Sequence, residues 1–582
     1  MRSKISFFNK GLFFSNIKRF SWACILETVV MFFFYPFSLM MMHPDAAWLE
    51  NVTDILERRQ EYTAFCNLSI CVYAVALAVL LFHYLHQPKM TTALHGLPVS
   101  RTELFFSAVL SGAVLLAVPI VLNVLLIFIT KATMEIGAWV LASSVLRWAA
   151  YALLLSLVLF AFTAFVGMFV GNPAAHFIFT YILHFLPLAV FAGFMALCQM
   201  FLYGFDTSFD IPQWILELPM MTVMHDFTRP CGYYMLLFAI LSVVFIVLAL
   251  VAYKKRPLEQ AGDVVVFSWV KPVFKYGVSV CFAVAGFLYI AGISGMETQD
   301  NLLGNTLLAA LWGAVGFIIA QMLIMKSWRI FGAYRELIGA CLAIALLFVL
   351  VQSDVTGFEK RTVIEEKVTS VTMSGFYDYA QSEITVSEAE SIALATKLHQ
   401  AFIDNRRELV EGDYPIYMRM EFKMEDGSVF RRAYNAPAQS ILLEMYNQPE
   451  FKRAGYPMLY ADVERIESIG IYTNDEKYYI NDRQRVLEAM RADIDARRFG
   501  EDYFRKEALV GASIGENYEV AKAEPSAKYH LEFEMTEPAY VERNNVYVAA
   551  YRSYYNFDIR EDEMPQTFAL LEELMPTLVP EE

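Results

Sequence analysis

Long uninterrupted hydrophobic runs dominate the first 353 residues of the chain. A helix that crosses the hydrocarbon core of a membrane needs roughly 20 apolar residues at 1.5 Å each. Because backbone groups in lipid must find their partners within the segment, such runs are predicted to be helical. Nine recur, at about 21–42, 64–86, 104–129, 148–170, 174–203, 233–253, 276–295, 304–325 and 336–353. The pattern predicts an α-helical polytopic membrane protein with about nine transmembrane helices, of which Pro119 and Pro187 kink two.

The pattern changes after residue 353, where short alternating segments and amphipathic helices replace the apolar runs. VTSVTMSG predicts a strand, and Ser387 with Glu390 suggests a capping box that opens a helix. YPIYMRMEFKMEDGSVFRRAYN alternates about Asp426-Gly427, which indicates a hairpin. A similar order follows in VERIESIGIYT, NDRQRVLEAMRADIDARR, KYHLEFEM and NVYVAAYRSYY. We therefore predict a C-terminal α+β domain over 354–582, built from two strand–helix–hairpin repeats with a final helix near 563–576.

Charge separates the same two regions. Residues 1–353 carry 20 basic and 17 acidic side chains, and residues 354–582 carry 26 and 44. The acidic half argues against nucleic acid as a partner, because phosphate binding needs a basic surface. All seven cysteines lie before residue 354, and neither CxxC nor Cys/His ligand spacing occurs, so no metal site is predicted.

The basic residues in short loops predict the orientation. With the N-terminus in the cytoplasm, fifteen basic residues face inward at 1–20, 87–103, 254–275 and 326–335, and five face outward. An odd number of spans then places residues 354–582 outside the cytoplasm. The expected location is the plasma membrane of a bacterium, with the lipid membrane as a partner.

Two cytoplasmic segments attract attention. Residues 1–20 mix Phe, Ile and Leu with basic residues, which is typical of an amphipathic helix in the membrane interface, although a polar leader with stray aromatics fits too. In the loop at 87–103, a turn at Gly96–Pro98 leads to Ser100 as an N-cap with Glu103 three residues on. This loop is either a docking site for a cytoplasmic partner or an ordinary connection between helices.

No motif for catalysis is evident. HExxH, a dinucleotide fingerprint and the phosphate loop GxxxxGK[ST] do not occur, so we predict no catalytic residue, no cofactor and no enzyme. If ATP drives this protein, a separate subunit binds it. Polar residues within spans are candidates for function because they are costly there. They are Glu27, Asn123, His176 and His184, each of which also fits a packing or interhelical hydrogen-bonding role.

Two stretches resemble a known family. LHGLPVSRTELFFSAVLSG resembles the segment after the second span of ABC transporter type 2 permeases of Gram-positive bacteria. KKRPLEQAGDVVVFSWVKPVFKYG resembles the linker after the sixth span of a subgroup with extra transmembrane helices and a C-terminal domain of uncharacterised role. The resemblance implies a six-span permease core at 21–253, a cytoplasmic linker at 254–275 and three additional helices at 276–353.

The resemblance also implies partners. The loop at about 87–103 would be a coupling helix seated on an ABC ATPase subunit, with a second permease copy or a paralogue completing the transporter. The residues expected to contact the ATPase are Leu94, His95, Leu97, Pro98, Arg101 and Glu103.

Function is therefore expected to be that of a permease subunit, exporting amphipathic, peptide or antimicrobial-type substrates and driven by a separate ATPase. The alternative is a membrane sensor whose extracytoplasmic domain binds a ligand and signals to a cytoplasmic partner. A scaffold for envelope assembly is the third reading.

Overall fold

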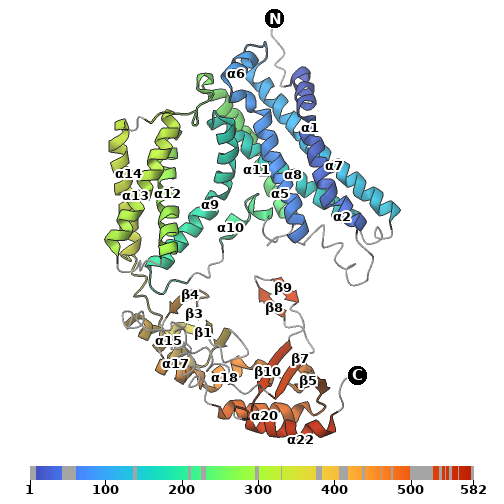
Figure 1. Ribbon diagram of the computed structural model, residues 1–582, viewed down its shortest axis with the longest axis vertical. Helices are drawn as coiled ribbons and strands as arrows, with labels where there is room; N and C mark the ends of the chain where they lie inside the picture. Colours follow the sequence, from blue (N-terminus) through green and yellow to red (C-terminus); the bar gives the residue numbers. More distant parts are fainter. Residues whose placement is uncertain are drawn as a thin grey trace. The chain divides into compact units, whose positions relative to one another are not determined.

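The computed structural model of the protein describes residues 8–41, 60–134, 141–206, 211–223, 231–294, 301–328, 331–374, 383–404, 417–435, 439–460, 462–473, 476–497, 528–535, 540–543, 546–549, 554–561 and 563–578. These residues form two compact units, coloured along the chain in Figure 1. The first unit comprises residues 1–197 and 209–350, and the second comprises residues 198–208 and 351–582.

The first unit is helical. Within the described residues, eight helical segments are long and apolar enough to cross a membrane. They are α1 (Lys10–Phe34) continued by α2 (Pro36–Met41), α7 (Arg101–Thr133), α8 (Ala142–Phe169), α9 (Pro173–Phe201), α11 (Cys231–Lys255), α12 (Val270–Ser294), α13 (Leu302–Met325) and α14 (Tyr334–Gln352). The remaining predicted run forms α5 (Gln60–Leu81), whose described apolar part is Asn67–Leu81. The predicted class of polytopic helical membrane protein is confirmed.

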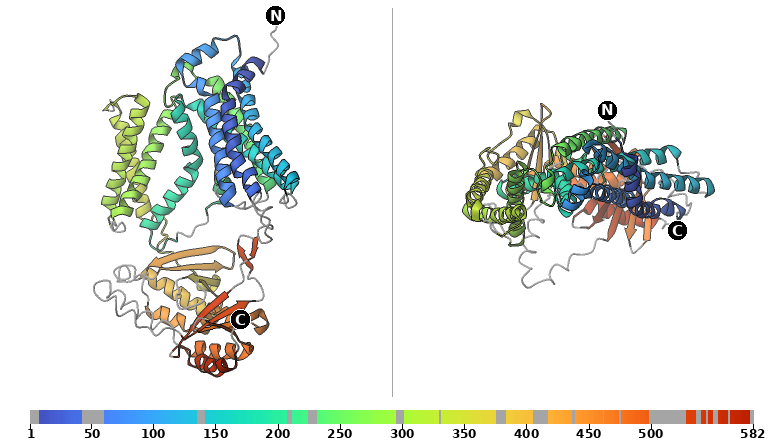
Figure 2. Two further views of the ribbon diagram at one scale, coloured as in Figure 1. Left: turned by 45° about the vertical axis from the view of Figure 1, so that its right-hand side comes forward. Right: turned by 90° about the horizontal axis from the view of Figure 1, so that it is seen from above.

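Helix α8 is the most buried of these helices and packs against α5, α7 and α11. Leu155, Val158 and Leu159 of α8 are fully buried in the hydrophobic core of this unit. Helices α12, α13 and α14 form a separate group in the left-hand view of Figure 2. Small residues allow their close approach, since a Cβ at Gly286 or Gly313 would overlap Trp312 or Ile344.

Pro119 lies inside α7 and has no N–H group, so the carbonyl of Leu115 loses its helical partner. The Tyr73 hydroxyl of α5 donates to this carbonyl at 2.9 Å. The buried side-chain amide of Asn123 donates to the carbonyls of Pro119, at 2.9 Å, and of Thr28 in α1, at 3.2 Å. The irregular backbone of α7 is therefore satisfied by side chains that also tie it to two neighbouring helices.

The N-terminal segment differs from the two separate elements expected for residues 1–20 and 21–42. From Lys10 onward the chain is one helix through Phe34, capped by the side chain of Asn9. The backbone N–H of Asn9 donates to Ser107, and the Asn16 amide donates to Ser111, both in α7. Polar partners on α7 therefore draw the start of α1 into the helix bundle. The expectation for residues 1–7 lies outside the described residues.

The second unit contains two copies of one arrangement, a hairpin, a helix and another hairpin. The first copy is β1 (Val368–Ser374), β2 (Glu383–Val386), α15 (Ala389–Asp404), β3 (Tyr417–Met424) and β4 (Val429–Asn435). The second is β5 (Ile466–Thr473), β6 (Glu476–Tyr479), α20 (Arg483–Ala496), β7 (Tyr529–Met535) and β10 (Tyr554–Ile559). The sheet orders, β2-β1-β3-β4 and β6-β5-β7-β10, correspond strand for strand.

The register repeats as well. The first strand of each copy carries an irregularity at its start, between Val368 and Ser370 in β1 and between Ile466 and Ser468 in β5. The predicted duplication is therefore present, with β2 and β6 as additional edge strands. These four-residue strands are too short for alternation to reveal them. A further hairpin, β8 (Tyr540–Arg543) with β9 (Val546–Ala549), precedes β10.

Carboxylates from other elements cap two helices of this unit, α15 and α22. Glu450 of α18 (Pro449–Gly455) accepts the N–H groups of Ser387 and Glu388 at the start of α15. This contact replaces the capping box that the sequence suggested. In the second copy, buried Asp493 of α20 accepts the backbone N–H and hydroxyl of Thr567 at the start of α22 (Pro565–Leu574).

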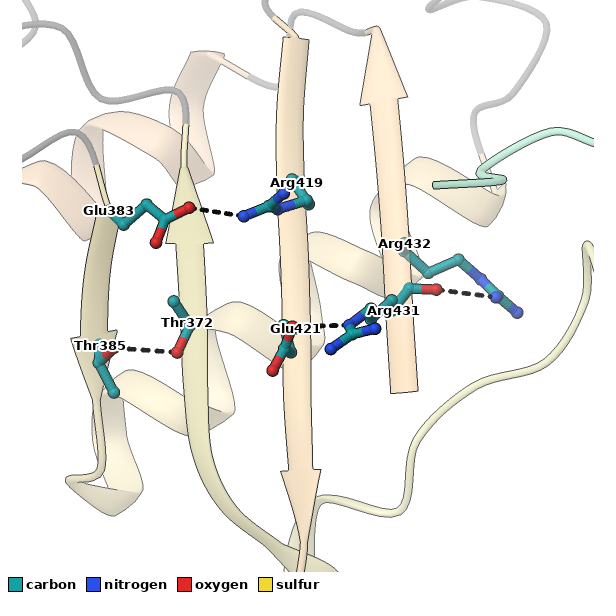
Figure 3. Close-up of polar contacts among 7 residues, drawn as sticks. All are labelled: Thr372, Glu383, Thr385, Arg419, Glu421, Arg431 and Arg432. Atoms are coloured by element: carbon teal, nitrogen blue, oxygen red, sulfur yellow. Dashed lines mark hydrogen bonds and ion pairs between the residues drawn. The ribbon is translucent and has the colours of Figure 1, made fainter. Parts of the chain in front are cut away.

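One face of the first sheet carries polar pairs between its strands, and one of them, Arg419 of β3 with Glu383 of β2, reaches across β1 (Figure 3). Arg419 bonds Glu383 at 2.5 Å, Arg431 bonds Glu421 at 2.7 Å, and the hydroxyls of Thr372 and Thr385 lie 2.9 Å apart. The other face packs on α15 and buries His399. Its Nδ1 accepts from the Tyr434 hydroxyl at 2.9 Å, and its Nε2 donates to the Arg361 carbonyl at 3.3 Å.

We predict that acid destabilises the first copy through His399. Burial, followed by the nearby positive charge of Arg432, lowers the pKa of His399 to about 4 from an unfolded value of 6.5. Between these values the unfolded state binds the additional proton, so stability falls as the pH drops from 6.5 to 4, by up to about 3 kcal/mol.

Hydrogen exchange of residues 389–404, followed against pH in the full-length protein, measures this loss. His399→Gln is expected to remove most of the pH dependence. The control His530→Gln alters an exposed histidine in the second copy and is expected to keep it. A pH response unchanged by His399→Gln would contradict the assignment.

Candidate coupling site

The segment between α5 and α7 folds into a short helix, α6 (Pro88–His95), preceded by the 3-10 turn η1 (His83–Leu85). Pro88 occupies the first helical position, where its missing N–H has no cost. The Thr91 hydroxyl donates to the carbonyls of Tyr84, at 2.6 Å, and Gln87, at 2.9 Å. Helix α6 is thereby tied back to the end of α5.

The start of α7 carries the predicted capping box. The Ser100 hydroxyl accepts the N–H of Glu103 at 3.2 Å, and the Glu103 carboxylate accepts the N–H of Ser100 at 2.8 Å. Such a cap stabilises a helix by about 1 kcal/mol. It also fixes the point at which the chain turns from α6 into α7.

His95 and Arg101 point toward α11. The Arg101 guanidinium donates to the carbonyls of Tyr253, Lys254 and Arg256, at 3.1 to 3.4 Å. The first two belong to the last turn of α11, where carbonyls have no helical partner, and the third follows the helix directly. The Nδ1 of His95 donates to the Thr91 carbonyl at 2.8 Å, so its Nε2 accepts from the Tyr253 hydroxyl at 3.0 Å. Burial lowers the pKa of His95, which keeps the ring neutral.

Arg256, which follows α11, joins the same helix ends through buried hydrogen bonds. Its guanidinium is 2% exposed and donates to the carbonyls of Gly167, Met168, Val170 and Leu85 at 2.5 to 3.0 Å. Burial lowers the pKa of Arg256 to about 10, so it remains charged at neutral pH. One side chain thus joins the ends of α8, α11 and η1. The sequence did not distinguish it from Lys254 and Lys255 in the same basic run.

The residues expected at the coupling site divide into two groups. Leu97 and Pro98 are exposed, with Leu97 43% exposed, and they continue the outward face of α6 formed by Lys89, Thr92 and Ala93. Leu94 packs against the hydrophobic core of the helical unit. His95, Arg101 and Glu103 make the internal contacts described above, so they position the segment. The geometry brings a rigid backbone and an exposed, largely apolar tip together.

The four polar candidates within spans all lie buried. Glu27 accepts from the Ser69 hydroxyl at 3.0 Å, and Asn123 satisfies the kink in α7. The Nε2 of His176 donates to the Thr163 carbonyl at 2.7 Å, and its Nδ1 lies 3.0 Å from the Nε2 of His86. His184, on the same face of α9, bonds the carbonyl of Thr180 at 2.8 Å. These contacts are interhelical or local hydrogen bonds.

His86 was not singled out by the sequence, since it lies at the edge of a hydrophobic run. It follows η1 and its ring meets that of His176 at a centroid distance of 5.0 Å. Because Arg256 bonds the adjacent Leu85 carbonyl, the start of α9 and the end of α5 meet at one buried point. The first turns of α9 are therefore part of the candidate coupling site.

A bundle of apolar helices with such a loop is typical of membrane permeases. Among curated proteins, the chain is similar to the probable ABC transporter permease YtrD of Bacillus subtilis (strain 168). The similarity amounts to 22% identity over 245 residues, which cover 40% of this chain and 71% of YtrD. No family model and no solved structure matches the chain. The chain is thus a distant relative of an ABC transporter permease.

We predict that Arg256→Ala destabilises the helical unit by about 3 kcal/mol, because four buried carbonyls lose their donor. Arg256→Lys is expected to be intermediate, since one ammonium group does not reproduce the planar fork of a guanidinium. Thermal unfolding of the detergent-purified protein measures the loss. Lys255→Ala, an exposed neighbour, is the matched control and is expected to unfold as the wild type does. Equal unfolding of the Arg256 and Lys255 variants would contradict this role.

Proposed function

We propose that this chain is the membrane-spanning permease subunit of an ABC transporter and that a separate ATPase subunit drives it. The distant similarity to YtrD and the bundle of apolar helices support this proposal. The observation that carries it is the build of the turn from α6 to α7, where His95 and Arg101 bond α11 on either side of the exposed Leu97 and Pro98. A rigid element with an apolar tip suits docking to another protein.

The proposed coupling follows from these contacts. A force applied to α6 passes to α11 through Arg101 and His95. It reaches α8 through the guanidinium of Arg256, which bonds α8 carbonyls and Leu85 together. ATP would be bound and hydrolysed in the partner, and this chain would move its helices in response. A connection between spans that served only to link them would not need three helices fixed at one point.

The finer features of the proposal rest on the resemblance stated above. They are export as the direction, an amphipathic, peptide or antimicrobial-type substrate, and a second permease copy or paralogue that completes the path. The similarity to a permease favours transport over ligand sensing as the role of the whole chain.

We predict that Leu97→Asp abolishes docking of the ATPase subunit while leaving the permease folded. A charge at the tip of α6 would be buried without a partner on docking, at a cost of several kcal/mol. Co-purification of the ATPase with the tagged chain from its native membranes measures the effect, and a loss of at least about tenfold is expected.

The control is Trp328→Asp, which alters an exposed apolar residue in the loop between α13 and α14. That variant is expected to keep the ATPase. Retention of the ATPase by Leu97→Asp would refute docking at this tip, and wild-type chain purified without any ATPase would refute the proposed function.

We further propose that the N-terminus is cytoplasmic and the C-terminal unit extracytoplasmic, as the distribution of Lys and Arg favours. A fluorescent protein that matures only in the cytoplasm, fused after Glu582, is expected to stay dark. The same protein fused before Met1 is expected to fluoresce. Fluorescence from the C-terminal fusion would reverse the arrangement.

A further inference from the structure

The last turn of α9 and the residues after it belong to the C-terminal unit. The boundary between the two units falls inside this helix, between Leu197 and Cys198. Tyr203, only 6% exposed, is a member of the hydrophobic core that the duplicated sheets and helices form. A residue from the exit of one apolar helix is therefore built into the core of a domain that begins about 150 residues later in the sequence.

Three segments make this connection, which we name the joint. They are residues 202–206 after α9, residues 354–361 after α14, and Arg432–Tyr434 of β4. The Gly204 carbonyl accepts the N–H of Ala433 at 3.2 Å, on the outer edge of the sheet, and the Tyr203 N–H donates to the Glu359 carboxylate at 2.8 Å. Rings meet in two places, Tyr203 with Tyr434 and Phe205 with Phe358, at centroid distances of 5.4 and 5.5 Å.

Gly204 is required by this geometry. Its φ of +76° is a left-handed conformation that side chains other than hydrogen disfavour. A Cβ at this position would also lie 2.7 Å from the ring of Tyr434. The backbone approaches β4 closely because no side chain intervenes.

The segment after α14 is fixed just as firmly. The Asp354 carboxylate accepts the N–H groups of Phe358, at 2.7 Å, and Glu359, at 2.9 Å. The buried guanidinium of Arg432 lies between the rings of Phe358 and Phe430, 3.7 and 4.2 Å from their centroids, and donates to the Phe358 carbonyl at 2.7 Å. Cation–π contacts of a desolvated arginine are among the stronger ones.

The other end of α9 lies at the candidate coupling site. His176, in the first turn, bonds α8 through Thr163 and meets His86 after α5. Just before the helix, the Gly171 N–H donates to the Asp263 carbonyl at 2.8 Å, in the segment that follows Arg256. Helix α9 has 29 residues, so it spans about 44 Å between these two fixed ends. Pro187 removes one backbone hydrogen bond inside the helix, but α9 runs unbroken from Pro173 to Phe201 and so links the two ends physically.

We propose that α9 couples the C-terminal unit to the coupling site, so that the state of this unit controls the permease core. The duplicated domain would then regulate the activity of the permease core. The inference rests on the proposed function only for its consequence in ATP hydrolysis, because the coupling along α9 is a property of this chain alone.

Hydrogen exchange in the full-length purified protein tests the coupling directly. Gly204→Val places a side chain against Tyr434, and Tyr203→Ser removes a ring from the core without straining the backbone. Both variants are expected to raise exchange by about fivefold or more at residues 198–206 and also at residues 83–95, which lie at the far end of α9. The matched control is Gly427→Val at the β3–β4 turn, where φ is +80° and nothing lies within 4 Å. Its effect is expected to stay at the turn.

Faster exchange confined to the C-terminal unit, with residues 83–95 unchanged in both joint variants, would overturn the proposal. So would an equal response at 83–95 in the Gly427 control. A second measurement is the ATPase rate of the complex with its co-purified ATPase, which the joint variants are expected to change at least about twofold. Coupling seen by exchange with an unchanged ATPase rate refutes control of the permease. If the wild-type chain carries no ATPase, the proposed function fails while the exchange result still decides the coupling.

Discussion

The helical unit depends on one constraint, that a backbone carbonyl without a helical partner must be satisfied by a side chain when no water reaches it. Helix ends and proline kinks create such carbonyls wherever the chain turns at the membrane face. Tyr73 serves the carbonyl that Pro119 leaves open in α7, and Arg101 serves the last turn of α11. Arg256 serves four carbonyls, three at the end of α8 and one in η1. Each of these donors comes from a different helix or loop than its acceptor. The hydrogen bonds that satisfy the backbone carbonyls therefore also hold neighbouring elements together.

The same constraint explains what the candidate coupling site is made of. Two residues that were expected to contact a partner instead bond α11, His95 from the end of α6 and Arg101 from the start of α7. What is left for a partner is the tip at Leu97 and Pro98, which makes few contacts of its own. A surface held in place by buried polar contacts presents its apolar residues with little loss of conformational freedom on docking.

Sequence reasoning succeeded where the signal is local. Apolar length located the helices, the Ser100–Glu103 spacing located the cap of α7, and Asp426-Gly427 located the β3–β4 turn. It failed where the partner lies far along the chain. Arg256 and Leu85 are 171 residues apart, and Ala433 meets Gly204 across more than 200 residues. Pattern and propensity carry no information about such pairs, so neither the role of Arg256 nor the joint was foreseen. The suggested cap of α15 failed for the same reason, since Glu450 competes from a distant helix.

The duplication inside the C-terminal unit shows that the joint is a specialised feature of one copy. The register aligns Met420 with Arg432 in the first sheet and Leu531 with Phe557 in the second, so Phe557 stands where Arg432 does. By the same alignment Ile559 stands where Tyr434 does. In the second copy apolar residues fill these positions. Phe557 packs against Tyr456 and Phe533, and Ile559 is fully buried.

An apolar pair is sufficient to close the core of this fold. The buried arginine and the hydrogen-bonded tyrosine of the first copy are therefore not required by the fold, and their contacts include the segments that follow α9 and α14. The two polar residues that distinguish the first copy, Arg432 and Tyr434, therefore both lie at the joint. This placement is expected if the first copy is the one that holds the end of α9.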